Sequence, residues 1–205
     1  MDPKALSTNE FLSSIAEEKV GFFPPVKAQA AGGSYFKVNQ IGNALPNPSK
    51  VRLLGAFIDG SMVEGYRAFI NNKPIRRKTL EEIPIDELGT NSFGQQEKPV
   101  LFWAFPVFVF DETNVQICEI HQVGLMRELE RLGNNPNWGD PRLYNIDIFK
   151  TGGGNRPAYQ LTPKRDSFPQ EHAESAGQAA DSIDLQKLFE GEDPFLPSDD
   201  SAPAQ

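Results

Sequence analysis

The stretch from Leu143 to Thr162, LYNIDIFKTGGGNRPAYQLT, carries the clearest strand pattern in the chain. In its first half apolar and polar residues alternate, which is the period of a strand with one buried face. A glycine-rich turn then precedes a second β-type run, so the stretch predicts a β-hairpin. We expect Tyr144, Ile146 and Ile148 to pack inward. Phe149 then lies on the opposite, polar face.

Similar runs occur on the N-terminal side of this hairpin. The runs 50–57 and 62–70 flank an Asp-Gly turn, which predicts a hairpin between them. Residues 100–110, VLFWAFPVFVF, are apolar at both odd and even positions. This predicts either a central strand covered on both faces or a strand with the core on one face and a ligand on the other. A four-residue turn joins this strand to a further run that ends at Ile120, so we expect another hairpin there.

One helix interrupts the strand pattern. Val123, Met126, Leu129 and Leu132 follow one another at helical spacing, and Gly133 provides a stop. Short, turn-connected strands with one inserted helix indicate a mainly β protein and favour a partly open barrel of the OB-fold type. A β-sandwich is the structural alternative. We assign this core to residues 34–165.

The acidic residues are concentrated near the C-terminus. The chain has 205 residues and a formal net charge of −8. Residues 166–205 hold ten acidic residues and one basic residue, for a net charge of −9. Because this segment is also poor in apolar residues, we predict a disordered acidic tail. Two groups of apolar residues among its acids are typical of a motif that docks on partner proteins; they are Ile183, Leu185, Leu188 and Phe189, and then Phe195 and Leu196.

The N-terminal residues 1–33 are predicted to form an arm with a short amphipathic helix at 9–18. The first residues lack the basic and apolar regions of a secretory signal. The apolar stretch 100–110 is about half of the ~20 residues that a membrane-spanning helix needs. A single cysteine, Cys118, excludes an internal disulfide and agrees with a reducing compartment. We therefore expect a cytoplasmic protein.

Basic residues cluster in the body of the chain. Residues 50–78 contain seven bases and two acids, and residues 142–165 contain five bases and one acid. Combined with the acidic tail, this asymmetry indicates a body that binds a polyanion.

Aromatic residues next to basic residues indicate that the polyanion is a single-stranded nucleic acid. Single strands are bound by aromatic side chains that stack on bases and by cations that contact phosphates. Arg67 and Phe69 share one face of their run, and Phe149 is followed by Lys150, so both places fit this pattern. The full set of predicted DNA contacts is Tyr35, Lys37, Arg52, Arg67, Phe69, Lys73, Arg76, Arg77, Lys78, Trp103, Phe149, Lys150, Arg156, Tyr159, Lys164 and Arg165.

The sequence gives no positive support for catalysis, a cofactor or a metal. Gly152 to Gly154 lack the Lys-Ser/Thr ending of a nucleotide-binding loop and are better interpreted as a hairpin turn. Cys118 and His121 have tolerable spacing for zinc ligands, but the other histidine, His172, lies in the predicted tail. Acidic pairs such as 86–87 fit solvated turns. We expect a protein that is not an enzyme.

Several motifs occur in a characteristic order before the acidic tail: 34–37, 50–55, 73–77, 98–111 and 138–163. In this order the chain resembles the single-stranded DNA-binding proteins of tailed bacteriophages, similar in plan to the T4-type helix-destabilising protein. The resemblance implies an OB-fold core that coats single-stranded DNA in replication, recombination and repair. It also implies self-association along the strand, for which Lys4 to Thr8 resembles the family's segment, and a tail that recruits replication or recombination proteins. The zinc ligands of the T4-type member have no counterparts here, so the resemblance is to a zinc-free branch.

Two other functions fit the same residues. An RNA-binding OB-type protein would use the same stacking and phosphate contacts, because only a contact to the 2′-hydroxyl distinguishes RNA from DNA. A non-enzymatic interaction or virion protein would use the acidic tail only to stay soluble.

Overall fold

A computed structural model of the chain describes residues 34–90, 94–152 and 157–196. The predicted N-terminal arm with its helix, residues 1–33, lies outside the described residues, and so do Arg156 and the end of the predicted tail, residues 197–205.

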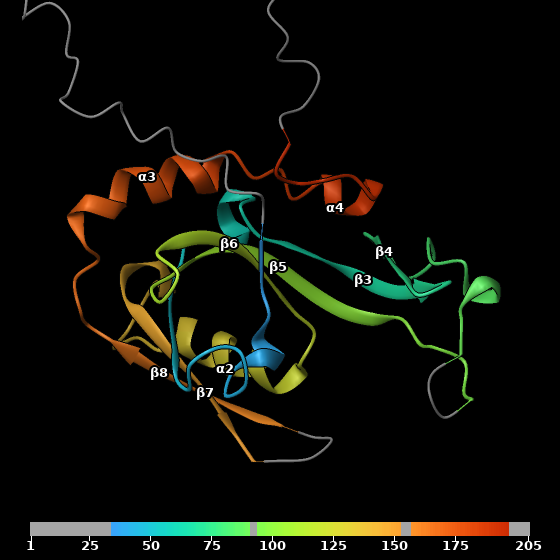
Figure 1. Cartoon of the computed structure of the whole chain (residues 1–205), viewed down its shortest axis with the longest axis horizontal. Helices are drawn as coiled ribbons and strands as arrows, with labels where there is room; N and C mark the ends of the chain where they lie inside the picture. Colours follow the sequence, from blue (N-terminus) through green and yellow to red (C-terminus); the bar gives the residue numbers. More distant parts are fainter. Residues whose placement is uncertain (1–33, 91–93, 153–156, 197–205) are drawn as a thin grey trace, which may run out of the picture. The chain divides into compact units, whose positions relative to one another are not determined.

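The described residues form strands, α-helices and short 3-10 helices (Figure 1). The strands are β1 (Tyr35–Phe36), β2 (Ser49–Leu53), β3 (Val63–Ile70), β4 (Lys73–Arg77), β5 (Val100–Val109), β6 (Asn114–Ile120), β7 (Asn145–Thr151) and β8 (Ala158–Lys164). The α-helices are α2 (Val123–Gly133), α3 (Gln170–Asp181) and α4 (Lys187–Glu190). The 3-10 helices are η1 (Val38–Gln40), η2 (Phe57–Asp59), η3 (Ile85–Glu87) and η4 (Pro141–Leu143).

The strands form one open, mixed sheet of eight strands whose main path is β1-β6-β5-β2-β7-β8. β5 pairs with β6 along one edge. Along the other edge it pairs with β3 as far as Ala104 and with β2 from Val107 onward. Pro106, which has no N–H to donate, lies at this change of partner, and its carbonyl accepts a hydrogen bond from Leu54. Within the described residues no pairing joins β8 to β1, so the sheet does not close.

The hairpins expected at 100–120 and 143–162 are confirmed as β5–β6 and β7–β8, and the expected helix is α2. The hairpin expected between 50–57 and 62–70 is wrong, because β2 and β3 each pair with β5 and not with one another. The Asp-Gly turn instead ends η2, with Gly60 at a φ of 77°.

β3 makes its hairpin with β4. The turn between them, Asn71-Asn72, has φ angles of 50° and 63°. Asparagine tolerates this left-handed backbone better than most residues, which is why it is favoured in two-residue hairpin turns.

The main core lies on the inner face of the sheet. Phe105 and Val107 of β5 pack there with residues of β2, β6 and α2. Tyr144, Ile146 and Ile148 belong to the same core, as their alternation predicts. No helix among the described residues is long and apolar enough to cross a membrane.

The outer face of β5 and β6 is covered by residues 166–196, which we call the C-terminal layer (Figure 1). Phe108 of β5 contacts Phe168 with ring centroids 5.0 Å apart and packs against Ala176 of α3. Phe102 of β5 and Ile117 of β6 pack against α4. β5 is thus buried on both faces by the chain itself, which is the first of the two arrangements that its sequence predicts.

The C-terminal layer contradicts the predicted disorder for residues 166–196. Leu185, Leu188 and Phe189, predicted to bind partner proteins, are buried against the chain's own sheet. Phe195 packs edge-on against Tyr35 at 6.0 Å. Of the predicted partner contacts, Leu196 is exposed. Low average hydrophobicity suggested disorder, but a few apolar residues suffice when an apolar sheet face is available to receive them.

Candidate nucleic-acid interface

The outer face of the sheet changes character where the C-terminal layer ends. Val63 of β3 is buried in the cluster that contains α4, and a Cβ added at Gly65 would lie 2.5 Å from a ring carbon of Phe189. The next residue on that face is Arg67, whose side chain is 18% exposed. In the β3–β4 register Arg67 is paired with Arg76, so two guanidinium groups lie side by side.

Glu119 of β6 supplies the counter-charge for both arginines. Its Oε1 accepts a hydrogen bond from Arg67 Nη1 at 2.7 Å, and its Oε2 accepts one from Arg76 Nε at 2.7 Å. Ile117, two residues earlier on β6, points to the same face, so strand alternation places Glu119 beyond the C-terminal layer. The Glu119 side chain is 8% exposed and forms charge-assisted bonds, which are among the strong hydrogen bonds of proteins.

These residues line a cleft of about 430 Å³, which we call the basic cleft. We define it by Tyr35, Lys37, Arg67, Arg76, Glu119 and His121. Three basic side chains and one carboxylate give it a net positive charge. It is the place where four predicted DNA contacts, from β1, β3, β4 and the β1–η1 connection, come together.

Aromatic side chains accompany the cations of the basic cleft. The Arg67 guanidinium lies over the ring of half-buried Phe69 at 5.3 Å. Tyr35 forms part of the cleft wall, and burial is the main cause that raises the pKa of its hydroxyl. The cleft therefore combines cations with aromatic surface, the combination that single-stranded nucleic acids require.

His121 lies next to Arg67 in this cleft. Arg67 Nη2 approaches His121 Nδ1 at 3.3 Å, so the neutral tautomer with the proton on Nε2 accepts a hydrogen bond. Desolvation lowers the pKa of His121, and the positive charge of Arg67 lowers it further, while Glu119 acts in the opposite direction. Sequence reasoning considered His121 only as a metal ligand. Glu119 was missed, although a lone acid between the apolar residues of β6 is a visible signal.

The other basic residues of the β3–β4 hairpin have different surroundings. Arg77 Nη1 donates hydrogen bonds to the carbonyls of Arg76 at 2.7 Å and of Phe189 at 3.0 Å. The ammonium group of Lys78 lies 5.6 Å from the centre of the Phe189 ring. Lys73 is exposed next to the hairpin turn. Arg77 and Lys78 thus tie the hairpin to the C-terminal layer.

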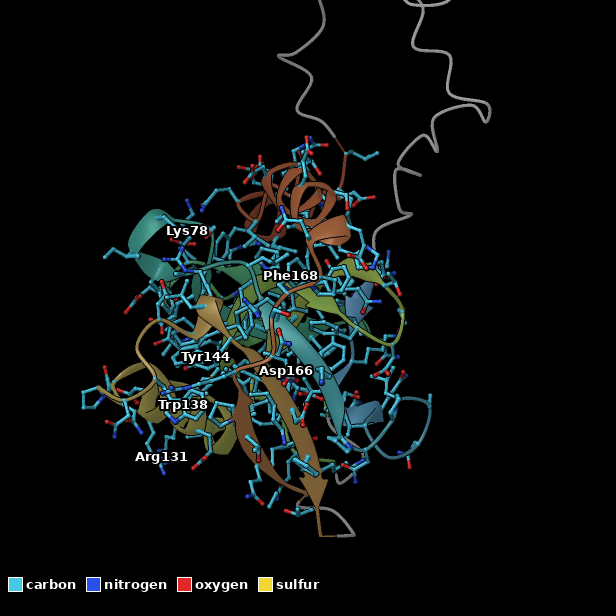
Figure 2. All side chains as sticks on the ribbon, turned by 90° about the vertical axis from the view of Figure 1, so that its left-hand side faces the viewer. Lys78, Arg131, Trp138, Tyr144, Asp166 and Phe168 are labelled. Atoms are coloured by element: carbon cyan, nitrogen blue, oxygen red, sulfur yellow. The ribbon has the colours of Figure 1, made fainter. Side chains whose placement is uncertain are left out.

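Arg52 is not available to a phosphate, which corrects its prediction as a DNA contact. It is 7% exposed, and Nε donates to Asn145 Oδ1 at 2.8 Å. Its Nη groups donate to the carbonyls of Arg142 and Asp166, and its guanidinium lies over the Phe168 ring at 5.3 Å. Figure 2 labels Asp166 and Phe168, where the chain crosses this part of the sheet. Arg52 therefore anchors the start of the C-terminal layer.

The predicted contacts on β7 and β8 lie outside the basic cleft. Lys150 Nζ donates to the Asn39 carbonyl at 2.9 Å, and Lys164 lies 3.6 Å from Asp147. Arg165 is exposed, with its guanidinium 5.0 Å from the Trp138 ring centre. The remaining two are partly buried aromatics: Phe149, and Tyr159, which packs against the main core.

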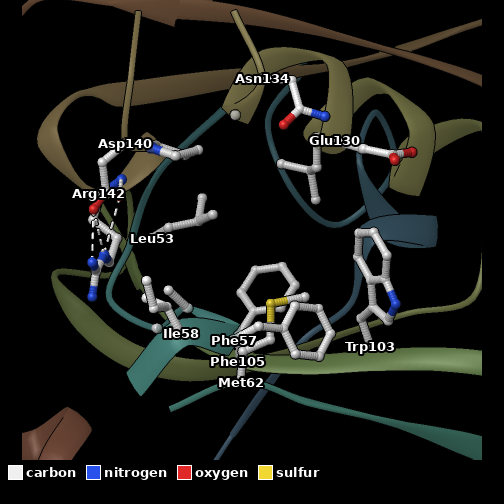
Figure 3. A pocket seen from close by; sticks show the side chains of 15 residues that line it. Leu53, Phe57, Ile58, Met62, Trp103, Phe105, Glu130, Asn134, Asp140 and Arg142 are labelled. Atoms are coloured by element: carbon white, nitrogen blue, oxygen red, sulfur yellow. Dashed lines mark hydrogen bonds and ion pairs between the residues drawn. The ribbon is translucent and has the colours of Figure 1, made fainter. Parts of the chain in front are cut away.

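Trp103 lines a different cleft, shown in Figure 3, which we call the apolar cleft. It has a volume of about 700 Å³ and lies between η2, α2 and η4. Trp103 contacts Phe57 edge-on at 5.8 Å and donates its indole N–H to Glu64 at 2.8 Å. The charges at this cleft are mostly negative, because its one lining base, Arg142, is paired with both Asp140 and Asp59. Such a rim repels phosphates.

Comparisons of the chain with protein families, with curated proteins and with solved structures returned no match.

Proposed function

We propose that the protein binds single-stranded DNA at the basic cleft and uses an OB-fold barrel as its scaffold. The observation that carries the proposal is the convergence of Lys37, Arg67 and Arg76 with Tyr35 at one cleft. Phe69 lies next to the cleft, where its ring contacts the Arg67 guanidinium. Cations there contact phosphates, and the aromatic rings offer stacking surfaces to bases.

The order of elements supports the scaffold. β2, β5, β6, α2, β7 and β8 follow one another in the chain, and β2 lies between β5 and β7 in the sheet. A five-stranded OB-fold has the same order, with its helix between the third and fourth strands. The β3–β4 hairpin is then an insertion between the first two barrel strands, and it supplies both arginines of the basic cleft.

The proposed role is to coat and protect single strands during phage DNA replication, recombination and repair, without catalysis. We also propose that the C-terminal segment recruits partner proteins. The partners would contact its exposed acidic residues and Leu196, because Leu185, Leu188 and Phe189 are buried.

Binding of labelled oligonucleotides tests the proposal. Fluorescence anisotropy with oligo(dT), oligo(U) and duplex DNA should give the tightest binding for oligo(dT). The logarithm of the affinity should fall with the logarithm of salt by roughly 0.7 per neutralised phosphate. Equal affinity for oligo(U) would favour the RNA-binding alternative. Failure to bind any of the three at low salt would contradict the proposal and favour an interaction or virion protein.

Variants locate the binding site in the same assay. Lys37→Ala removes an exposed cation without a hydrogen-bond partner among the described residues, so it should weaken binding and leave the fold intact. Replacing Arg67 and Arg76 together should weaken binding on the order of tenfold per guanidinium, because charge-assisted hydrogen bonds are lost. Arg131→Ala on α2, where the side chain is 65% exposed, is the matched control and should bind normally.

A further inference from the structure

The basic cleft contains a carboxylate that a simple anion-binding surface would not need. Glu119 repels phosphate and cancels one positive charge, yet it lines the cleft with 8% of its side chain exposed. It is also bound to the two arginines that make the cleft positive. Its function follows from how those bonds are distributed.

Glu119 gives one oxygen to each arginine and uses a different edge of each. It binds Arg67 through Nη1 and Arg76 through Nε. A guanidinium is planar and rigid, so a bond to one edge fixes the direction of the N–H groups on the others. Cross-strand neighbours with like charges repel each other, and the shared carboxylate removes this repulsion.

Several donors at the cleft remain available. Among the described residues, the Nη groups of Arg76 and the Nζ of Lys37 have no hydrogen-bond partner, and the hydrogen-bond partner of Arg67 Nη2 is His121 Nδ1. A phosphodiester carries oxygens that accept from such a set of donors, and arginine's fixed fork matches phosphate well.

On the basis of the proposed function, we infer that Glu119 is a positioning residue. It holds Arg67 and Arg76 in the orientation in which they, together with Lys37, bind one phosphate of the strand. Glu119 does not touch the DNA. It lowers the net charge of the cleft and in return fixes the geometry of its donors, so that binding depends on orientation as well as on charge.

Two substitutions separate orientation from charge. Glu119→Asp keeps the charge but is one methylene shorter, so it cannot hold both guanidinium groups. Affinity for oligo(dT) should fall about tenfold, the order of a lost charge-assisted hydrogen bond, with an unchanged salt slope. Glu119→Gln adds one net positive charge to the cleft. The slope should become steeper by roughly 0.7, and binding should be weaker than wild type at about 0.5 M salt, where screening removes the added attraction.

Other roles for Glu119 predict other results. If Glu119 only repels the strand, Glu119→Gln binds more tightly than wild type at low salt and equally at about 0.5 M salt, and Glu119→Asp binds normally. If it only stabilises the fold, both variants melt earlier and the folded fraction binds as wild type does. Either result overturns the inference. Neither result contradicts the proposed function, provided that the wild-type protein binds oligo(dT). Should both variants fail to fold, Arg76→Lys decides, because it keeps the charge and removes the planar edge. Normal affinity for that variant would also overturn the inference.

Discussion

The outer face of the sheet has two regions that share one backbone pattern and differ in what covers them. Over β5 and β6, Phe102, Phe108 and Ile117 are buried by the C-terminal layer. Farther along the same face Arg67 and Glu119 line the basic cleft, which no described segment fills. Alternation places all of these side chains on one face, so the chemistry of each residue decides its region. Apolar residues are buried under the C-terminal layer and stabilise the fold, whereas Arg67 in the basic cleft stays partly exposed to a ligand.

The largest expected effect comes from removing the cover. A chain truncated after Arg165 exposes the apolar region, including Phe102 and Phe108, and should lose cooperative thermal unfolding and aggregate. The point variant Phe189→Ala should lower the free energy of unfolding by about 3–5 kcal/mol. Exposed Glu190→Ala is the control, with an expected change within about 0.5 kcal/mol. Cooperative unfolding of the truncated chain at the wild-type temperature would show that the layer is not part of the fold.

Arg52 and Arg67 test whether the same residue type has different functions in the two regions. Arg52→Ala leaves the buried Asn145 without its donor, so the free energy of unfolding should fall by about 1–3 kcal/mol. The folded fraction should bind oligo(dT) normally. Lys98→Ala, which removes an exposed base without a hydrogen-bond partner among the described residues, is the control for stability. If Arg52→Ala weakens DNA binding and leaves the stability unchanged, Arg52 contacts a phosphate after all.

Phe69 and Phe149 test where bases stack. Phe69 contacts Arg67 and lies next to the basic cleft, so Phe69→Ala should weaken oligo(dT) binding by about 1–3 kcal/mol with little change in melting temperature. Phe149 lies outside that cleft, and Phe149→Ala should have a smaller effect in the same titration. The reverse order of effects would place the strand over β7.

The smallest expected effect is a pH dependence of stability. The pKa of His121 is below its ordinary value of 6.5, so below about pH 6.5 the unfolded chain binds the proton more readily than the folded chain. This contribution to the free energy of unfolding is therefore fully present above that pH and is lost as the pH falls toward the folded-state pKa. Urea midpoints for wild type and His121→Gln should converge as the pH falls from about 7.5 to 5.5. A constant difference between the two proteins would contradict the assignment.

Local patterns in the sequence predicted much of the fold. Alternation placed Tyr144, Ile146 and Ile148 in the core, and the two-sided apolar run of β5 indicated cover on both faces. Alternation also placed Arg67 and Phe69 on one face of β3. Tyr66, Ala68 and Ile70 lie on the opposite face and pack in a separate small cluster. Periodicity reports which face a residue occupies, because that depends only on local backbone geometry.

Features that depend on distant partners were not predictable in this way. The cover of β5 comes from Leu188 and Phe189, whose segment looked disordered by composition. The sequence predicts Arg52 as a phosphate contact, whereas in the fold its guanidinium donates hydrogen bonds to Asn145 and Asp166. Glu119 joins the site only through strand pairings that bring β3, β4 and β6 together. Each of these outcomes is fixed by long-range contacts that no single stretch of sequence displays.

Cross-linking tests the central claim most directly. Oligo(dT) carrying 5-iododeoxyuridine is irradiated in complex with the full chain, and the linked peptides are identified by mass spectrometry. We expect cross-links at the aromatic residues of the basic cleft and next to it, Tyr35, Phe69 and His121. Cross-links confined to Trp103 and Phe57 of the apolar cleft would contradict the account, because they would place the strand against an acidic rim and away from Arg67 and Arg76.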